Sequence, residues 1–121
     1  MFADAEALVV QFLEGLLGDV PVATKVPNPR PATFVRAWRT GGAAVNRVLD
    51  RPLITVQAWG PDSVTASKLA GRCRDMMLSA SGRIPLVRLA GEPTGLYFDP
   101  DPDTGCDRYT FTHQLSVRAT F

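Results

Sequence analysis

The C-terminal segment of the chain alternates apolar and polar side chains without interruption. The apolar positions are Tyr109, Phe111, His113, Leu115, Val117, Ala119 and Phe121, and the residues between them are polar or charged. A period of two over thirteen residues predicts a β-strand with one buried and one solvent-exposed face. At about 3.3 Å per residue such a strand would extend roughly 43 Å. A globule of 121 residues is only about 35 Å across.

This mismatch in length leaves two possibilities for the last strand. It either bends around the sheet or overhangs it. An overhanging edge would offer unpaired amides to another chain. The length of the segment therefore favours oligomerisation.

Two segments carry apolar side chains at helical spacing. The first stripe consists of Leu8, Val9, Phe12, Leu13, Leu16 and Leu17. Asp4 is placed to cap this helix, and Gly18 followed by Pro21 ends it. The second stripe, which follows Pro61 at a typical first-turn position, consists of Ala66, Leu69, Ala70, Cys73, Met76, Met77 and Ala80. Both stripes predict core, and the methionines are interpreted as core residues rather than as a binding patch.

Four further segments have the composition of strands, namely residues 20–26, 33–40, 53–59 and 85–90. The sequence PNPRPA at 27–32 is predicted to be a stiff extended connector, because three prolines remove three amide donors. Twelve residues, 41–52, separate the second and third of these strands, whereas hairpin loops usually have two to five. Such a loop is either disordered or reaches for a partner. The residues alone therefore predict an α/β domain.

Charge is unevenly distributed along the chain, although the net charge is only +1. Residues 1–19 carry four carboxylates and no basic residue, whereas residues 20–60 carry six basic residues and one acid, Asp50. Two faces of opposite sign that dock onto neighbours would explain this pattern, and so would chance clustering on a solvated surface. The small net charge does not indicate a nucleic-acid or membrane partner.

The sequence DPDPDTGCD at 99–107 raises the question of a metal site. An EF-hand calcium loop has acidic ligands at positions 1, 3 and 5, glycine at 6 and glutamate at 12. Three aspartates match the first three positions, but Thr104 and Thr110 occupy the last two. The prolines also stiffen the backbone that would have to wrap the ion. The segment is therefore predicted to be a turn around Gly105. The alternative is that its aspartates bind a divalent ion weakly at the surface. No cofactor is predicted.

No residue pattern of an enzyme is found, and no catalytic residue is predicted. The single histidine, His113, lies on the apolar side of the last strand and is interpreted as structural. Arg36 and Trp38 share one face of a predicted strand while Arg39 points to the other, which argues against a stacking platform for nucleic acid.

The cysteines and the start of the chain bear on its location. Cys73 and Cys106 match no zinc spacing and are expected to be free thiols. The first ten residues contain acids and no basic residue, so we expect no secretory signal. No apolar run approaches the roughly 18 residues of a membrane span, so we expect no membrane partner.

Long stretches of the chain, and the order of its elements, resemble a known family. The sequence PNPRPATFVRAWRTGG leads through a loop into DRPLITVQAWG, and YFDPDPDTGCDRYTFTHQLSVRA follows near the end. In this arrangement nearly the whole chain is similar to tail terminator proteins, also called tail completion or minor tail proteins, of long-tailed actinobacterial phages. Two residues depart from the family's pattern without threatening the fold. At the position of His113 relatives more often hold an aliphatic residue, and Cys106 is an unusual residue for the turn.

The resemblance implies one domain over residues 1–121 with an α/β (α+β) fold, a mixed, mainly antiparallel sheet of about four to five strands packed on two helices. It implies a non-enzymatic virion protein that forms a ring of six copies, caps the tail tube, ends its polymerisation and offers a surface for head–tail joining. The implied partners are further copies of the chain, the tail tube protein and head–tail connector proteins. DNA would pass through the ring without sequence-specific binding. The implied location is the tail-neck region of the virion, and the host cytoplasm during assembly.

Five arginines are the candidates for contacts with neighbouring copies or with the tube. They are Arg36, Arg39, Arg47, Arg51 and Arg118. Two other interpretations remain open at this point. The chain could be a neck or head-closure protein on the capsid side, or a small intracellular ligand-binding or regulatory domain.

Overall fold

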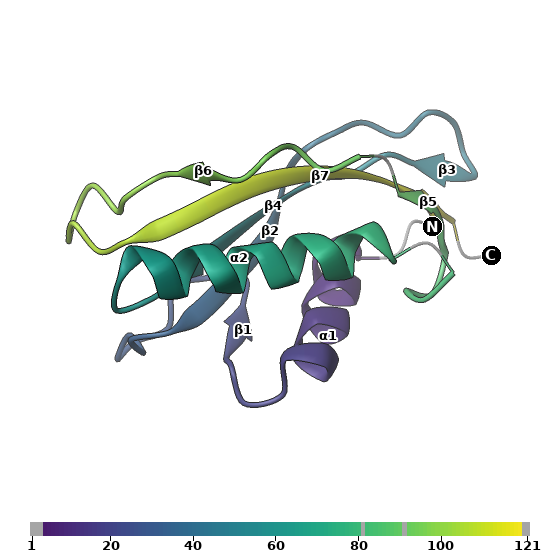
Figure 1. The fold of residues 1–121 in the computed structure, drawn as a ribbon. Helices are drawn as coiled ribbons and strands as arrows, with labels where there is room; N and C mark the ends of the chain where they lie inside the picture. Colours follow the sequence, from purple (N-terminus) through teal and green to yellow (C-terminus); the bar gives the residue numbers. More distant parts are fainter. Residues whose placement is uncertain (1–3, 81, 91, 120–121) are drawn as a thin grey trace.

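The computed structural model describes residues 4–80, 82–90 and 92–119 of the chain. Its elements are α1 (Ala5–Leu17), β1 (Val22–Ala23), β2 (Phe34–Gly41), β3 (Leu49–Asp50), β4 (Leu53–Trp59), α2 (Ser63–Leu78), β5 (Val87–Ala90), β6 (Tyr97–Phe98) and β7 (Arg108–Arg118). Both helices lie on one face of a single curved sheet, so the molecule has two layers (Figure 1). The fold is therefore α+β, as the sequence predicts.

The sheet is mixed and mostly antiparallel. Its strands follow in the order β1-β2-β4-β7-β3, with β5 and β6 also paired to β7. Only β1 and β2 run parallel, whereas β2–β4 and β4–β7 are long antiparallel pairs. Three of the seven strands have only two residues, which explains why the sequence predicts four to five.

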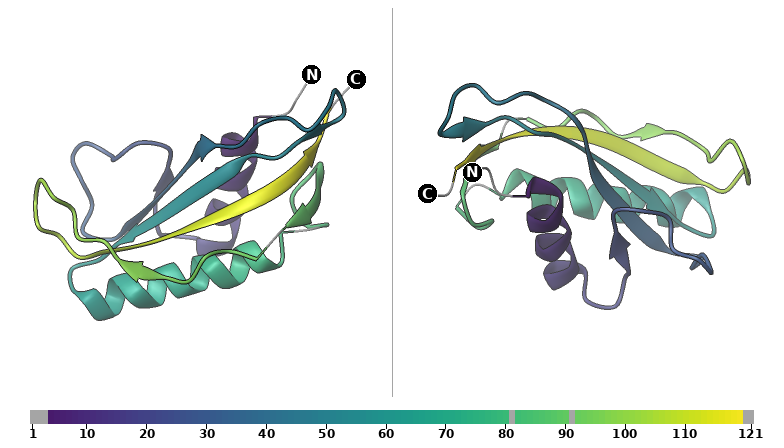
Figure 2. Two further views of the ribbon diagram at one scale, coloured as in Figure 1. Left: turned by 90° about the horizontal axis from the view of Figure 1, so that it is seen from above. Right: turned by 180° about the vertical axis from the view of Figure 1, so that it is seen from behind.

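The long last strand lies inside the sheet and not at an overhanging edge. Along one side it pairs with β4 and then with β3, and along the other with β6 and then with β5. Val117, for example, is paired with Asp50 on one side and Val87 on the other. Of the two possibilities for this strand, the structure shows the bend and not the overhang, because β3, β5 and β6 cover its amides beyond β4. The strand curves over the helices, as Figures 1 and 2 show.

The core lies between the sheet and the two helices. α1 packs against β1 and β2, and α2 packs against β4 and β7. Fully buried side chains on the helix side of the three longest strands include Val35, Ala37, Ile54, Val56, Phe111, Leu115 and Val117. From the helices, Val9, Leu13, Leu17, Ala66, Leu69, Ala70, Cys73 and Met77 complete this cluster. The apolar stripes predicted from the sequence are therefore core, except that Leu16 is exposed.

Both helices begin at an aspartate that caps their first turn. Asp4 Oδ1 accepts a hydrogen bond from the amide of Ala7 at 3.2 Å, and Asp62 Oδ1 accepts one from the amide of Thr65 at 2.7 Å. Such caps satisfy amides that have no partner within the helix. Asp4 confirms the prediction, whereas Pro61 precedes the cap and lies outside the first turn.

Residues 41–52 are not the structureless loop that their length predicts. They contain β3, and Ala44 forms a bridge with Asp50, so that residues 44–50 fold into a short hairpin. Asn46 Oδ1 accepts hydrogen bonds from the amides of Val48 and Leu49, at 2.9 and 3.0 Å. We call residues 44–50 the hairpin tip.

Candidate interaction surfaces

The acidic sequence DPDPDTGCD forms a tight turn between β6 and β7. The amide of Gly105 donates to the carbonyl of Asp101 at 2.7 Å, and the amide of Asp101 donates to the carbonyl of Cys106 at 3.0 Å. Gly105 has a φ of +71°, a conformation that glycine adopts without steric cost. Asp101 Oδ1 also accepts from the amide of Asp103 at 3.0 Å. The prediction of a turn around Gly105 is confirmed.

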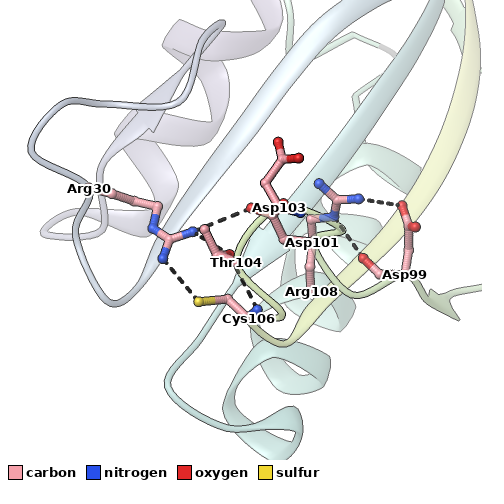
Figure 3. Close-up of polar contacts among 7 residues, drawn as sticks. All are labelled: Arg30, Asp99, Asp101, Asp103, Thr104, Cys106 and Arg108. Atoms are coloured by element: carbon pink, nitrogen blue, oxygen red, sulfur yellow. Dashed lines mark hydrogen bonds and ion pairs between the residues drawn. The ribbon is translucent and has the colours of Figure 1, made fainter.

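Two of the aspartates in this turn form ion pairs (Figure 3). Arg30, from the proline-rich connector, places Nη1 at 3.4 Å from Asp101 Oδ2 and also donates to Thr104 Oγ1. Arg108 places Nη2 at 3.2 Å from Asp99 Oδ2. The turn therefore anchors the connector to the start of β7.

Local hydrogen bonds stabilise the ionised form of Asp101. The pKa of Asp101 is lowered, chiefly because its carboxylate accepts from the Asp103 amide and, less strongly, from Thr104. Both hydrogen bonds come from donors of this chain, so the lowered pKa of Asp101 requires no bound cation. Among the described residues, no group of three or more histidine, cysteine or acidic side chains is placed to hold a metal ion.

A third ion pair lies at the opposite end of the sheet and holds the hairpin tip. Arg39 donates from Nη1 to Asp50 Oδ2 at 2.7 Å and from Nη2 to Asp50 Oδ1 at 3.0 Å. It also donates to the carbonyls of Gly41 and Gly42. The hydrogen bond to Asp50, which is buried, raises the pKa of Arg39. Arg39 is therefore committed to contacts within its own chain.

The face of the sheet away from the helices carries the stacked, buried rings of Phe34 and Trp59 and also polar side chains, among them Arg36. Its guanidinium lies 3.7 Å from the ring centroid of Trp38, and its Nε donates to the carbonyl of Thr24 at 2.9 Å. Partial burial, and then the charge of Arg108, lower the pKa of Arg36. Beside it, hydroxyl groups of Thr40, Thr55 and Thr112 form a chain of contacts across three strands.

The other three candidate arginines belong to the end of the molecule that carries β3. Arg47 is in the hairpin tip, and Arg51 follows it and donates to Gln114 Oε1 at 3.3 Å. Arg118 is the β7 residue that pairs with Leu49 of β3. All three are exposed. The structure thus brings these three to the end where Arg39 holds the hairpin tip, and it places Arg36 on the sheet face away from the helices, which no local sequence pattern indicates.

The first helix is less available as an acidic docking face than its sequence indicates. Asp4 caps the helix, and Glu6 Oε2 accepts from the backbone amide of Arg39 at 3.3 Å. The two remaining acids of this segment, Glu14 and Asp19, are exposed.

At the end opposite β3, apolar side chains are exposed beside the start of α2. Val64, Tyr97 and Phe98 are among the most exposed large apolar residues of the described chain. The rings of Phe98 and Tyr109 have centroids 5.4 Å apart. Tyr109 and Val64 border a hollow of about 270 Å³, together with Ser63, Ser67 and Lys68. Sequence analysis missed this cluster, because β6 has only two residues.

The described chain holds one histidine and two cysteines, of which one cysteine lies in the turn. His113 is buried on the helix side of β7, as predicted. Burial raises the pKa of the Cys73 thiol to about 12, which disfavours its reactive thiolate form. Cys106 is half-buried in the turn, where its Sγ accepts from Arg30 Nη2 at 3.0 Å. Neither cysteine of the described chain forms a disulfide.

Within the described part of the chain, no helix has the length and hydropathy to cross a membrane.

Comparison with known proteins identifies the class to which this fold belongs. A chain of a solved structure titled "Virion of native gene transfer agent (GTA) particle" superimposes with a TM-score of 0.60 and 20% sequence identity, covering 96% of each chain. At this identity the match concerns the fold. No curated protein matches the sequence.

The sequence itself identifies the family. Residues 1–97 match the family model described as "Phage tail termination protein". The chain belongs to this family and is therefore a structural protein of phage tails. Membership in this family speaks against the alternative of an intracellular ligand-binding or regulatory domain.

Proposed function

We propose that the chain ends the growth of the phage tail tube by forming a ring of six copies that caps it. The observation that carries the proposal is the family match over residues 1–97. The surface of the ring that faces away from the tube would receive the head–tail connector proteins, and DNA would pass through its centre without sequence-specific contacts. The ring would act in the tail-neck region of the virion after assembly in the host cytoplasm.

The distribution of exposed residues supports a subunit that contacts several neighbours. The described surface has a basic end around Arg47, Arg51 and Arg118, a polar sheet face around Arg36, and an apolar end around Phe98. A closed ring needs two unlike complementary patches on each subunit, and a cap needs a further surface for the tube. In this proposal the exposed arginines serve these contacts, and Arg39 supports them by holding the hairpin tip.

Polymerisation of purified tail tube protein in the presence of the chain tests this function. We expect tubes to stop growing when the chain is present at a few copies per tube end, and electron micrographs to show extra density at one end only. As a matched control, the double variant Arg47→Glu/Arg51→Glu should fold but cap poorly. Tubes that grow equally long with and without the chain would contradict the proposal.

The remaining alternative, a neck protein on the capsid side, makes a different prediction. It would bind DNA-filled heads that lack tails and leave free tubes bare. Fractionation of tail-less heads and head-less tails, followed by detection of the chain in each, separates the two functions.

A further inference from the structure

The two ends of the sheet carry exposed apolar side chains of different shape. At one end, Val45 and Val48 of the hairpin tip are 55% and 48% exposed. The tip is narrow and ordered by its own hydrogen bonds, including one from the amide of Val45 to the carbonyl of Leu49 at 2.9 Å. Its two valines are about half exposed, so the tip presents apolar side chains to solvent.

At the other end, apolar side chains lie beside a hollow. We call Val64, Phe98 and Tyr109 the aromatic end; Tyr97, which pairs with Thr110, faces the other side of the sheet. Phe98 pairs with Tyr109, and both lie on the helix side of the sheet. Val64 and Tyr109 line the hollow of about 270 Å³ described above. Phe98 is 49% exposed and Val64 is 60% exposed, so exposed apolar side chains lie beside a hollow whose other lining residues are Ser63, Ser67 and Lys68.

The two features lie far apart on the same chain. β6 pairs with β7 at Tyr109 and Thr110, whereas β3 pairs with it at Val117 and Arg118. Eight residues of strand separate these points, which corresponds to roughly 26 Å. Figures 1 and 2 show β3 at one end of the sheet and the start of α2, with the turn between β6 and β7, at the other. The tip of one chain therefore lies far from its own aromatic end.

The charges around the two features are complementary. Arg47, Arg51 and Arg118 surround the hairpin tip, and the one acid within the tip, Asp50, is already paired with Arg39. Asp62 caps α2 next to Val64, and Asp103 and Asp107 lie in the turn between β6 and β7; none of these three forms an ion pair with another described residue. Lys68 is the basic residue that lines the hollow itself. The tip end is thus basic, whereas the helix start and the turn at the other end carry unpaired acids.

We infer that the hairpin tip of one copy docks into the aromatic end of the next copy of the same chain. Val45 and Val48 would pack against Phe98 and Val64, while the arginines around the tip would approach the acids at the start of α2 and in the turn between β6 and β7. Such a contact is heterologous, since it joins two different patches, and its repetition closes a ring or builds a filament. The inference rests on the proposed ring and names the surfaces that would form it.

Two variants, each defective at one end, test this contact. We expect Val48→Asp and Phe98→Asp each to abolish the species larger than the 13.1 kDa monomer that wild-type protein forms in sedimentation velocity. An unpaired carboxylate in an apolar contact is strongly unfavourable, which is the reason for this choice. Val26→Asp is the matched control, because Val26 is 44% exposed but lies in neither feature. It should assemble as wild type does.

Mixing the two defective variants distinguishes a head-to-tail contact from other arrangements. Val48→Asp keeps an intact aromatic end, and Phe98→Asp keeps an intact tip, so the mixture should form a 1:1 dimer and nothing larger. Thermal melting of each variant alone checks that it is folded. Restoration of a dimer by mixing would be difficult to explain by misfolding of either chain.

The possible results separate this inference from the proposed function. If wild-type protein stays monomeric at all concentrations and beside tail tubes, the ring and the contact both fail. If wild type forms rings and both Asp variants do so equally well, the contact fails and the ring stands. If both variants are monomeric and folded but their mixture contains no dimer, the head-to-tail pairing is wrong.

Discussion

The ion pairs at the two ends of the sheet differ in geometry and in burial. At the hairpin end, Arg39 and Asp50 form a two-pronged pair in which the Asp50 side chain is only 3% exposed. At the other end, Arg30 and Asp101 meet through a single contact of 3.4 Å, with 29% and 14% exposure. A buried carboxylate depends on its partner far more than an exposed one does. The comparison indicates that the hairpin tip depends on its ion pair, whereas the turn depends on its backbone.

Loss of Arg39 should have the largest effect on stability. Arg39→Met leaves Asp50 buried without a counter-charge, and we expect a loss of about 3 kcal/mol in the free energy of unfolding. Urea denaturation measures this loss. The double variant Arg39→Met/Asp50→Leu should recover part of it, because it removes the buried charge itself. A double variant less stable than Arg39→Met would contradict this explanation of the pair.

The second-largest effect is expected at Gly42, where the chain enters the hairpin. Gly42 has a φ of +84°, and a Cβ at this position would collide with the backbone carbonyl of Arg51. We expect Gly42→Ala to lower the free energy of unfolding by about 2 kcal/mol. Gly41→Ala is the matched control, because a Cβ there meets nothing within 4 Å. Equal effects of the two substitutions would show that the hairpin can shift without cost.

A smaller effect is expected at the opposite end. Arg30→Ala removes a partly exposed ion pair, so we expect a loss of less than about 1 kcal/mol. The turn should keep its shape, because the bonds of Asp101 with Gly105 and Cys106 are made by the backbone. Thermal unfolding compared with Arg39→Met measures the difference. A melting temperature lowered as far as that of Arg39→Met would show that the Arg30–Asp101 pair stabilises the fold as much as the Arg39–Asp50 pair does.

The smallest effect concerns the dependence of stability on pH. In the folded chain the pKa of Asp101 is below its ordinary value of 3.8. The ionised carboxylate therefore contributes to the free energy of unfolding in full at pH values above 3.8. This contribution is lost as the pH falls through the lowered folded pKa. The difference in stability between wild type and Asp101→Asn should therefore shrink as the pH is lowered from 7 towards 3. A difference that grows at acid pH would show that the carboxylate is not stabilised by folding.

The helices and the longest strands could be predicted because their patterns are local. The bounds of β4 agree with the predicted 53–59, and the apolar stripes of both helices mark their buried faces. The turn at 99–107 was also predictable, since proline and glycine restrict or permit particular backbone conformations.

The features that depend on long-range pairing could not be predicted. Whether β7 lies at an edge depends on β5 and β6. β5 lies within the predicted strand 85–90, but its pairing with β7 has no local signal, and the two residues of β6 were not predicted as a strand. The ion pair of Arg39 with Asp50 could not be predicted, because the two residues become neighbours only when residues 41–52 fold back. The aromatic end combines residues of α2, β6 and β7 that are distant in the sequence. Each of these features follows from the topology and not from a motif.

Electron microscopy of the purified protein, alone and bound to tail tubes, tests the central claim most directly. We predict closed rings in which the β3 end of each subunit meets the neighbouring subunit where α2 begins and β6 lies. Every contact around the ring should join these two unlike ends. A strict monomer under both conditions, or assemblies in which like ends meet across a two-fold axis, would contradict the account.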